Sequence, residues 1–582
     1  MKKRLTTACM FIVTAVVIVS FIAPAIFGQE KKKKTIPTAT PAKVRFNVVE
    51  ASIPDMQKAM REGRSTSREI VEQYLFRIAM YEDRLNAIIA VNPNVLKEAD
   101  ALDRERAQGN VRGPLHGIPI ALKDNIQTTD MPTTGGVLAF DGFVPPYEAT
   151  VTRKLREAGA IIIAKTHLTE LSNWVAPFQA MGAYNALNGY GFNPYDPRRD
   201  PREATADGRA ALSPSGSSSG TGTAANFWAA NIGTDTSGSI LWPAHSNMLA
   251  AVRPTVGRIS RYGIIPVTLD QDTAGPMTRN VTDAAIILGV LEGPDPNDPV
   301  TKTKRCTAPP NSDYTQFLKR DGLKGARIGI PRANYYDEIK APGSGELRGG
   351  LDPDGVKMMS EVIELLRKEG AVIVDPADIP SIVDKNADDN LLDRRFCFDM
   401  DQVKARRCST VVAYGFARDF NQWLASAGDS VPVKSLTELR KWNNAHQKMG
   451  AIKYGQGLLD LSDAMDLDMF RPRYEADRSK DLFLTTTHGV DEVMNAKNLD
   501  ALLFPFALNA SMTARPGYPT VTVPFGMLPN APDTPFPEKF AAKPKPLGVS
   551  FTGMACSEPI LLKLAYAFEQ ATMRRIPPPL FP

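Results

Sequence analysis

The sequence predicts an α/β sandwich, because short apolar runs typical of buried strands alternate with longer stretches of helical periodicity. Apolar residues recur at helical spacing from 70 to 81. The apolar run at 118–122 predicts a buried strand, and a helix at 149–158 leads to a second buried strand at 160–165. Helices that follow strands in this way pack against a sheet and bury its faces.

The same two patterns continue along the chain. Residues 184–215 are rich in Pro, Gly, Asn and Asp and predict a loop, whereas 306–490 predicts a mostly helical, irregular insertion. Ser67 is a candidate N-cap for the first long helix. Further helices are expected at 95–107, 224–231, 281–291, 355–369 and 558–572, and further strands at 85–91, 325–331, 371–374, 499–504 and 520–523.

The N-terminal segment has the pattern of a secretory signal peptide, with a basic start, an apolar run from about Ala8 to Phe27 and small residues near its end. We expect a signal peptide at 1–28, a flexible linker at 29–47 and a single domain at 48–582. The chain is then exported to the periplasm or secreted. An uncleaved anchor is the alternative, because the apolar run is nearly long enough to span a bilayer.

The net charge of +5 belongs to this N-terminal segment. Residues 1–34 contain seven lysines and arginines and one glutamate, which leaves 62 basic and 63 acidic residues in the remainder. A nucleic-acid surface needs basic residues clustered on the folded body. We therefore expect no nucleic-acid partner, and no contact with a membrane beyond the possible anchor.

Four cysteines follow the signal peptide: Cys306, Cys397, Cys408 and Cys556. An exported protein can pair them, and Cys397 and Cys408 are the closest in sequence. Buried or unpaired thiols are the alternative. None of the four has the CxxC spacing of a zinc site.

Lys123 stands inside an otherwise apolar, strand-like run. Burial lowers the pKa of a lysine and favours its neutral amine, which is a competent general base beside a hydroxyl. The alternative is a structural lysine, paired with Asp124 or solvated at the end of the strand.

Two loops rich in serine and glycine follow. Gly216–Gly220 matches the G-x-S-x-G nucleophile elbow of α/β-hydrolases with Ser218 at its centre, but no long hydrophobic strand precedes it. Ser239 closes the second loop, Gly233–Ser239, in which consecutive backbone N–H groups could stabilise an oxyanion. Asp235 in this loop is expected to accept hydrogen bonds from the loop amides. Flexible linkers or glycine turns are the structural alternatives for both loops.

In combination and in this order, the motifs resemble the amidase signature family. Several linked motifs make the resemblance specific, and it covers about residues 48–576. The matching segments are Gly113–Asn125, Ala164–Thr166, Gly216–Gly220, Gly233–Ile240, Arg253–Gly263, Asp272–Pro276, Gly517–Pro524 and Pro546–Phe551.

The resemblance implies a three-layer α/β/α sandwich around a mixed, largely parallel twisted sheet. It also implies hydrolysis of a small-molecule or peptide amide by a Ser–cisSer–Lys triad, without cofactor or metal. Lys123 is then the base, Ser217 relays the proton after a cis peptide bond, and Ser239 attacks the carbonyl to form an acyl-enzyme that water hydrolyses. The implied oxyanion hole consists of the backbone N–H groups of Thr236, Ser237 and Gly238.

The chain departs from the family pattern at three places. The serine loop is short before its helix, so Ser215 or Ser218 could take the place of Ser217 as the relay. Ser237 stands where many members have a second glycine. Leu241–Trp242 replaces the arginine and its following residue that are common after Ile240.

Two other functions fit the sequence less well. One is a non-catalytic secreted binding protein on the same scaffold, and the other is an α/β-hydrolase that uses Ser218 with a late histidine such as His488. A component of a tRNA amidotransferase, which shares the family, works in the cytosol and does not suit an exported chain. We expect the substrate pocket to be lined by residues between about 306 and 491 and by the loop at 184–215.

Overall fold

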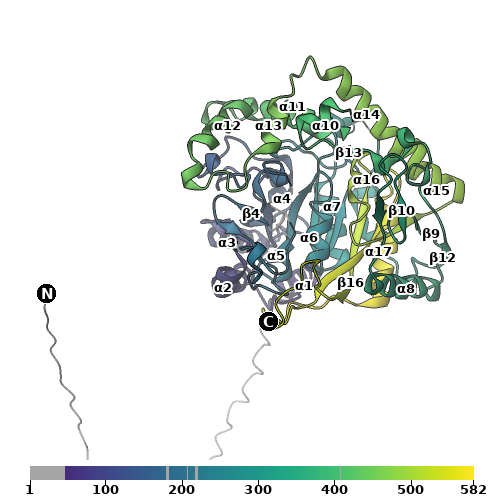
Figure 1. Cartoon of the computed structure of the whole chain (residues 1–582). Helices are drawn as coiled ribbons and strands as arrows, with labels where there is room; N and C mark the ends of the chain where they lie inside the picture. The colour runs from purple at the N-terminus through teal and green to yellow at the C-terminus, as the bar shows by residue number, and fades with distance from the viewer. Residues whose placement is uncertain (1–45, 178–182, 206, 216–219, 304, 407) are drawn as a thin grey trace, which may run out of the picture. The chain divides into compact units, whose positions relative to one another are not determined.

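An eleven-stranded mixed sheet forms the centre of the fold (Figure 1). The computed structural model describes residues 46–177, 183–205, 207–215, 220–303, 305–406 and 408–582. In spatial order the strands are β1 (Ile88–Val91), β3 (Ile161–Thr166), β2 (Pro119–Lys123), β6 (Ala230–Asp235), β8 (Thr273–Thr278), β7 (Ala250–Arg253), β16 (Thr520–Leu528), β17 (Lys545–Thr552), β15 (Ala501–Pro505), β9 (Arg327–Gly329) and β12 (Val372–Val374).

Parallel pairing forms two blocks in this sheet. Strand β2 pairs in parallel with β3 and β6, and β9 pairs in parallel with β12 and β15. The strands between the blocks, and the edge strand β1, pair antiparallel. The predicted α/β class with a mixed sheet is confirmed, and its antiparallel pairs are concentrated in the middle. Because β2 and β6 are parallel neighbours, Lys123 and the residues after Asp235 lie at the same edge of the sheet.

Helices cover the sheet, and several begin and end where the sequence predicts. The helix predicted around 70–81 is α2 (Ser67–Leu85), which has a capping box of Thr66 and Glu69, so Thr66 and not Ser67 is the N-cap. None of the helices in the described residues is long and apolar enough to cross a bilayer. The others that contact the sheet include α3 (Val95–Ala107), α4 (Thr150–Glu157), α6 (Leu241–Ser246), α7 (Val281–Leu291), α8 (Pro353–Lys368) and α17 (Glu558–Thr572).

The helix predicted at 224–231 is wrong. The structure has a five-residue helix, α5 (Gly220–Ala224), and β6 begins a few residues later. Asn226 adopts a left-handed conformation with φ of 57°, which prevents the helix from continuing. The indole of Trp228 is fully buried in the core beyond this point. A short apolar run predicts burial but does not distinguish a helix from a strand.

Residues 391–490, called the helical insertion below, form a group of helices (green in Figure 1) whose hydrophobic core is shared with residues from 137–143, 171–175 and 265–267. This is the later part of the predicted insertion, since β9, α8 and β12 in the earlier part belong to the main sheet and its cover. Its core includes Phe416, Phe420 and Trp423, and it is distinct from the core under the sheet. The helices are α10 (Met400–Lys404), α11 (Val411–Ser426), α12 (Leu436–Ala445), α13 (Gly457–Asp463) and α14 (Arg471–Thr485).

Smaller elements complete the described chain. Three two-stranded pairs lie outside the main sheet, and short helices fill the connections. The pairs are β4 (Tyr184–Asn185) with β5 (Gly189–Tyr190), β10 (Glu338–Lys340) with β11 (Leu347–Gly349) and β13 (Arg395–Phe396) with β14 (Cys408–Ser409); the helices are α1 (Ile53–Arg61), α9 (Pro380–Val383), α15 (Asp491–Lys497) and α16 (Ala510–Ala514).

All four cysteines that follow the N-terminal apolar run form disulfides. Cys397 pairs with Cys408 inside the helical insertion, and Cys306 pairs with Cys556, which is 250 residues away in sequence. The alternative of unpaired thiols is therefore wrong.

Candidate active site

Lys123 is the last residue of β2, and its side chain is fully buried. Its Nζ donates a hydrogen bond of 3.0 Å to Thr234 Oγ1 on the neighbouring strand β6. Burial lowers the pKa of Lys123 to about 8, while the nearby carboxylates of Asp235 and Asp272 act in the opposite direction. An appreciable fraction of the amine is therefore neutral near neutral pH, as a general base requires.

Asp124, the residue after Lys123, pairs with a different lysine. Its Oδ1 lies 3.0 Å from Nζ of Lys165 on β3, and both side chains are fully buried. Lys165 also donates to Thr133 Oγ1 at 2.7 Å, and the Thr134 N–H donates to Asp124 Oδ2 at 3.1 Å. This arrangement contradicts the structural alternative in which Asp124 neutralises Lys123, and it explains how a second buried lysine is accommodated.

Asp235 shapes the turn that carries Ser239. Its carboxylate accepts the backbone N–H groups of Gly238 and Ile240, each at 2.8 Å, as the sequence predicted for this residue. It also lies 3.0 Å from Nε of Arg253 on β7, and both side chains are fully buried. Ser239 lies between the two bonded amides and is partly exposed. The carboxylate thus holds both ends of the turn in which the candidate nucleophile lies.

Arg253 connects motifs that are far apart in sequence. Besides Asp235, its guanidinium donates to the carbonyl oxygen of Tyr518 at 2.9 Å and to that of Gln271 at 2.8 Å. Gln271 precedes Asp272, whose Oδ1 accepts a bond of 2.6 Å from the Thr236 hydroxyl. Motifs that are far apart in the sequence are therefore connected by one buried hydrogen-bond network next to the turn.

The predicted oxyanion hole needs one correction. The N–H of Gly238 donates to Asp235, so this amide is engaged within the turn. Gly238 has φ of 122°, and a Cβ there would lie 2.7 Å from Cδ1 of Trp242, so only glycine fits. The N–H groups of Thr236 and Ser237 stay predictions for this role.

The departures from the family pattern have structural explanations. Ser237 is exposed and is not among the described residues with positive φ, so a side chain is accommodated there. Leu241 is fully buried against Ala507 and Ala510. Trp242 is 37% exposed and lines a cavity, so the chain presents an aromatic surface beside the place of the family's arginine.

The candidate relays Ser217 and Ser218 lie outside the described residues. Ser215, the third candidate, is described: it has φ of 76°, its N–H donates to Ser213 Oγ at 3.1 Å, and it lines the same cavity as Ser239. Ser215 is thus the one candidate relay that the structure describes, and the choice of the relay stays a prediction.

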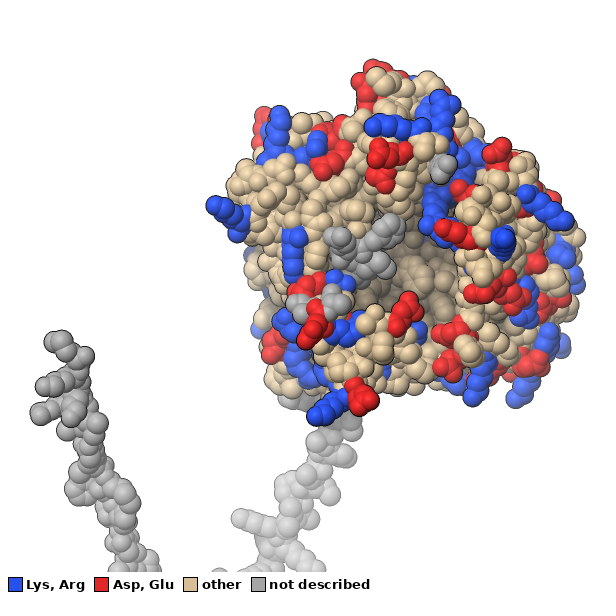
Figure 2. All heavy atoms as spheres, viewed as in Figure 1, with Lys and Arg blue, Asp and Glu red and all other residues tan. Residues whose placement is uncertain are grey.

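A cavity of about 490 Å³ contains Ser239. Ser213 and Ser215 line it from the predicted loop, and the helical insertion supplies a further wall, so the predicted origin of the pocket is confirmed. No charged side chain lines it among the described residues. Figure 2 shows this face hollowed, with uncharged residues over most of the floor. The insertion's wall consists of Phe398, Val412 and Leu458.

A larger cavity of about 700 Å³ lies elsewhere. It is lined by residues such as Phe46, Glu72 and Phe76 and contains none of the predicted site residues that the structure describes. Size alone therefore does not identify the candidate active site. The smaller cavity does, because Ser239, the candidate nucleophile, and Ser215, a candidate relay, both line it.

Sequence reasoning missed the wall formed by Ser172, Asn173 and Trp174. Leu171, Ser172 and Asn173 all adopt positive φ, at 43°, 56° and 73°, and this left-handed turn brings Trp174 to the cavity. Leucine and serine rarely adopt this conformation, so their presence gave no signal for such a turn.

His488, the base of the α/β-hydrolase alternative, is occupied elsewhere. Its Nε2 lies 2.8 Å from Asp384 and its Nδ1 lies 3.1 Å from Glu492. It is not among the described residues that line the cavity with Ser239. The structure therefore provides no histidine for that mechanism in the described part of this cavity.

Comparison with known proteins agrees with this fold. The amidase family model matches residues 69–562, and the chain belongs to this family. It is 32% identical to a probable amidase of Arabidopsis thaliana over 92% of each chain. The structure is also similar to the crystal structure of a peptide amidase from Stenotrophomonas maltophilia, with a TM-score of 0.74. The two sequences are 35% identical, and the match covers 91% of this chain and 98% of the other.

Another relative, which matches a shorter part of the chain, has a name that indicates a different activity. The chain is 38% identical to one component of the glutamyl-tRNA(Gln) amidotransferase of Chloroflexus aurantiacus over 323 residues. The matched part is 55% of this chain and 58% of the relative. This relative therefore matches a smaller share of the chain than the two amidases do.

Proposed function

We propose that this protein hydrolyses carboxamides through a serine nucleophile activated by Lys123. The observation that carries the proposal is a fully buried lysine, with its pKa lowered to about 8, at the sheet edge where the Ser239 turn lines a cavity. Binding alone requires neither a buried lysine that deprotonates near neutral pH nor a serine turn that lines a cavity at the ends of the same strands. Their combination favours an enzyme over a non-catalytic binding protein.

The reaction proceeds in two balanced steps. Neutral Lys123 accepts the proton of Ser217, and Ser217 accepts that of Ser239, whose Oγ forms a bond to the amide carbonyl carbon. The C–N bond breaks, and the leaving amine or ammonia takes the proton back through the relay. Water then gives a proton to the relay and attacks the acyl carbonyl carbon; the bond to Ser239 Oγ breaks, Ser239 takes the proton back, and the carboxylic acid leaves.

The substrate class that we propose is an uncharged peptide amide or small-molecule carboxamide. A cavity of about 490 Å³ lies within the size range of small-molecule sites, and its wall from the insertion is apolar. The similarity to a peptide amidase over most of both chains supports the peptide amide in particular.

The first experiment labels the protein with a fluorophosphonate probe and locates the adduct by mass spectrometry, because this requires no substrate. We expect the label on Ser239. Ser239→Ala should remove it, and Ser239→Ala and Lys123→Ala should each lower amide hydrolysis by at least about a thousandfold without loss of the fold. Labelling of Ser218 instead, or full activity of either variant, contradicts the proposed roles.

We also propose that the protein is exported. The N-terminal pattern supports this, as do the two disulfides, since disulfides persist mainly in oxidising compartments. Cell fractionation and the intact mass of the protein test it. We expect a mature chain that begins near residue 29 outside the cytoplasm; a full-length chain in the cytoplasm would contradict the proposal.

A further inference from the structure

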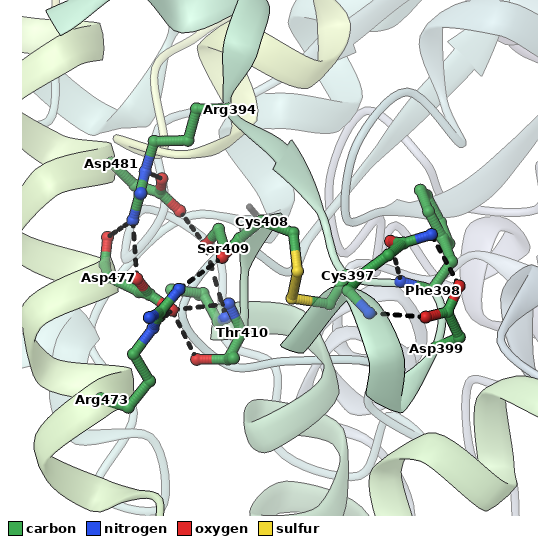
Figure 3. The surroundings of a disulfide bond; sticks show 12 residues. Arg394, Cys397, Phe398, Asp399, Cys408, Ser409, Thr410, Arg473, Asp477 and Asp481 are labelled. Atoms are coloured by element: carbon green, nitrogen blue, oxygen red, sulfur yellow. Dashed lines mark hydrogen bonds and ion pairs between the residues drawn. A yellow bond between two sulfur atoms is a disulfide. The ribbon is translucent and has the colours of Figure 1, made fainter. Parts of the chain in front are cut away.

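One wall of the cavity comes from residues that lie close in sequence to the two cysteines of a disulfide. Phe398, which lines the cavity, directly follows Cys397. Val412, which also lines it, lies in the first turn of α11 and follows Cys408 by four residues. The disulfide between Cys397 and Cys408 therefore ties together the two segments that supply this wall (Figure 3).

The disulfide belongs to the packed interior of the insertion. Cys397 is 1% exposed and Cys408 is 3% exposed, and both belong to its hydrophobic core. The two segments also form the short parallel pair of β13 and β14, and the Cys397 N–H donates to the Ser409 carbonyl at 3.0 Å. A buried disulfide of this kind keeps the two strands in place, and thiols in solution have little access to it for exchange.

A cluster of ion pairs anchors the far side of the same pair of strands. Asp477 and Asp481 on α14 bind Arg394 at 2.9 Å and 2.7 Å. Asp481 also accepts the Ser409 hydroxyl at 2.6 Å, and Asp477 accepts the Thr410 N–H at 2.9 Å. Figure 3 shows the disulfide between this cluster and Phe398. The cluster fixes the strands to α14, and the disulfide is the covalent link next to the residue that reaches the cavity.

We propose that Phe398 is a specificity-determining residue that contacts the acyl part of the amide, and that the Cys397–Cys408 disulfide is the device that holds it there. This inference rests on the proposed amidase function. Phe398, Trp174 and Trp242 give the cavity three aromatic walls. Aromatic rings present a large apolar surface to a bulky apolar group, so the preferred substrate is an amide whose acyl part carries such a side chain.

The test compares kcat/KM for N-acetyl-phenylalaninamide and N-acetyl-glycinamide. We expect Phe398→Ala to lower the preference for the phenylalanine amide about tenfold, mainly through KM, and Phe398→Leu to retain most of it. The double variant C397A/C408A should lower the preference at least threefold. The matched control is C306A/C556A, which removes the other disulfide and should keep the wild-type preference.

A comparison of single, double and triple variants shows whether the disulfide affects the substrate preference through Phe398. The triple variant with F398A, C397A and C408A should lose no more preference than F398A alone, because the disulfide has nothing left to position. Additive losses would overturn the positioning role, and an unchanged preference in F398A would overturn the whole inference. If C397A/C408A does not fold, F398A and F398L still decide the role of Phe398. If the wild-type protein hydrolyses neither amide and a fluorophosphonate probe does not label Ser239, the proposed function is overturned instead.

Discussion

A lysine side chain that is fully buried favours its neutral form, because its charge loses the solvation of water. At Lys123 this effect exceeds the attraction of two carboxylates and brings the pKa to about 8. The Thr234 hydroxyl accepts a hydrogen bond from the amine and fixes its direction. One residue thus acquires both the protonation state and the position that a general base needs.

The rate of hydrolysis should follow the titration of Lys123. Below its pKa of about 8 the amine is protonated and inactive as a base, so kcat/KM should rise about tenfold per pH unit and level off above pH 8. A profile of kcat/KM from pH 5 to pH 10 measures this. Lys123→Arg, which keeps its proton throughout, should be inactive at every pH. A flat profile between pH 5 and pH 7 would contradict a lysine base.

For individual residues, the sequence predicted which side chains carry the chemistry, but it predicted few of the contacts around them. A lysine within an apolar strand predicts burial, and a carboxylate within a glycine turn predicts hydrogen bonds to amides. The partner of Asp124 could not be predicted, because the choice between Lys123 and Lys165 depends on how β2 and β3 pair. The engagement of the Gly238 amide likewise depends on the conformation of the turn.

Among the elements, β6 and the turn that follows it position Ser239, the proposed nucleophile. Asp235→Asn should disturb this turn, since an amide replaces the carboxylate that binds two N–H groups and the buried Arg253. Breaking a buried ion pair costs about 3–5 kcal/mol. We expect a loss of this size in the free energy of unfolding, measured in urea, and at least a tenfold fall in kcat.

The control for this variant is a carboxylate on the surface. Glu361 pairs with Arg574, and both side chains are about half exposed. Glu361→Gln should change the free energy of unfolding by less than about 1 kcal/mol and leave hydrolysis unchanged. Equal effects of the two variants would show that Asp235 has no special part in the turn.

The predictability of the elements follows from their length. Long amphipathic helices such as α3, α7 and α17 have several turns of consistent periodicity, and their predicted bounds agree with the structure. The run at 224–231 is short and mostly apolar, so periodicity could not separate helix from strand there. The left-handed turn at 171–173 is set by its surroundings, so local sequence did not reveal that wall of the site.

In the whole molecule the two disulfides should differ in what they stabilise. In the chain-entropy model, a loop of 250 residues contributes about 5 kcal/mol and a loop of 11 residues about 3 kcal/mol. We therefore expect C306A/C556A to lower the midpoint of thermal unfolding more than C397A/C408A does, as measured by calorimetry. The reverse order would show that strain or residual structure outweighs loop length.

The hydrophobic core of the helical insertion is distinct from the core beneath the sheet, although it includes residues from 137–175 and 265–267, while the buried lysine and the serine turn depend on strand pairing and on the core beneath the sheet. In the function that we propose, the reactive groups therefore lie on the sheet, and part of the wall that selects the substrate lies on the insertion. Replacing residues 391–490 by the corresponding part of a relative would exchange one set of walls for another around an unchanged reaction. Such an arrangement allows the substrate preference to change by substitutions in the insertion, without substitutions at the residues that we propose to catalyse the reaction.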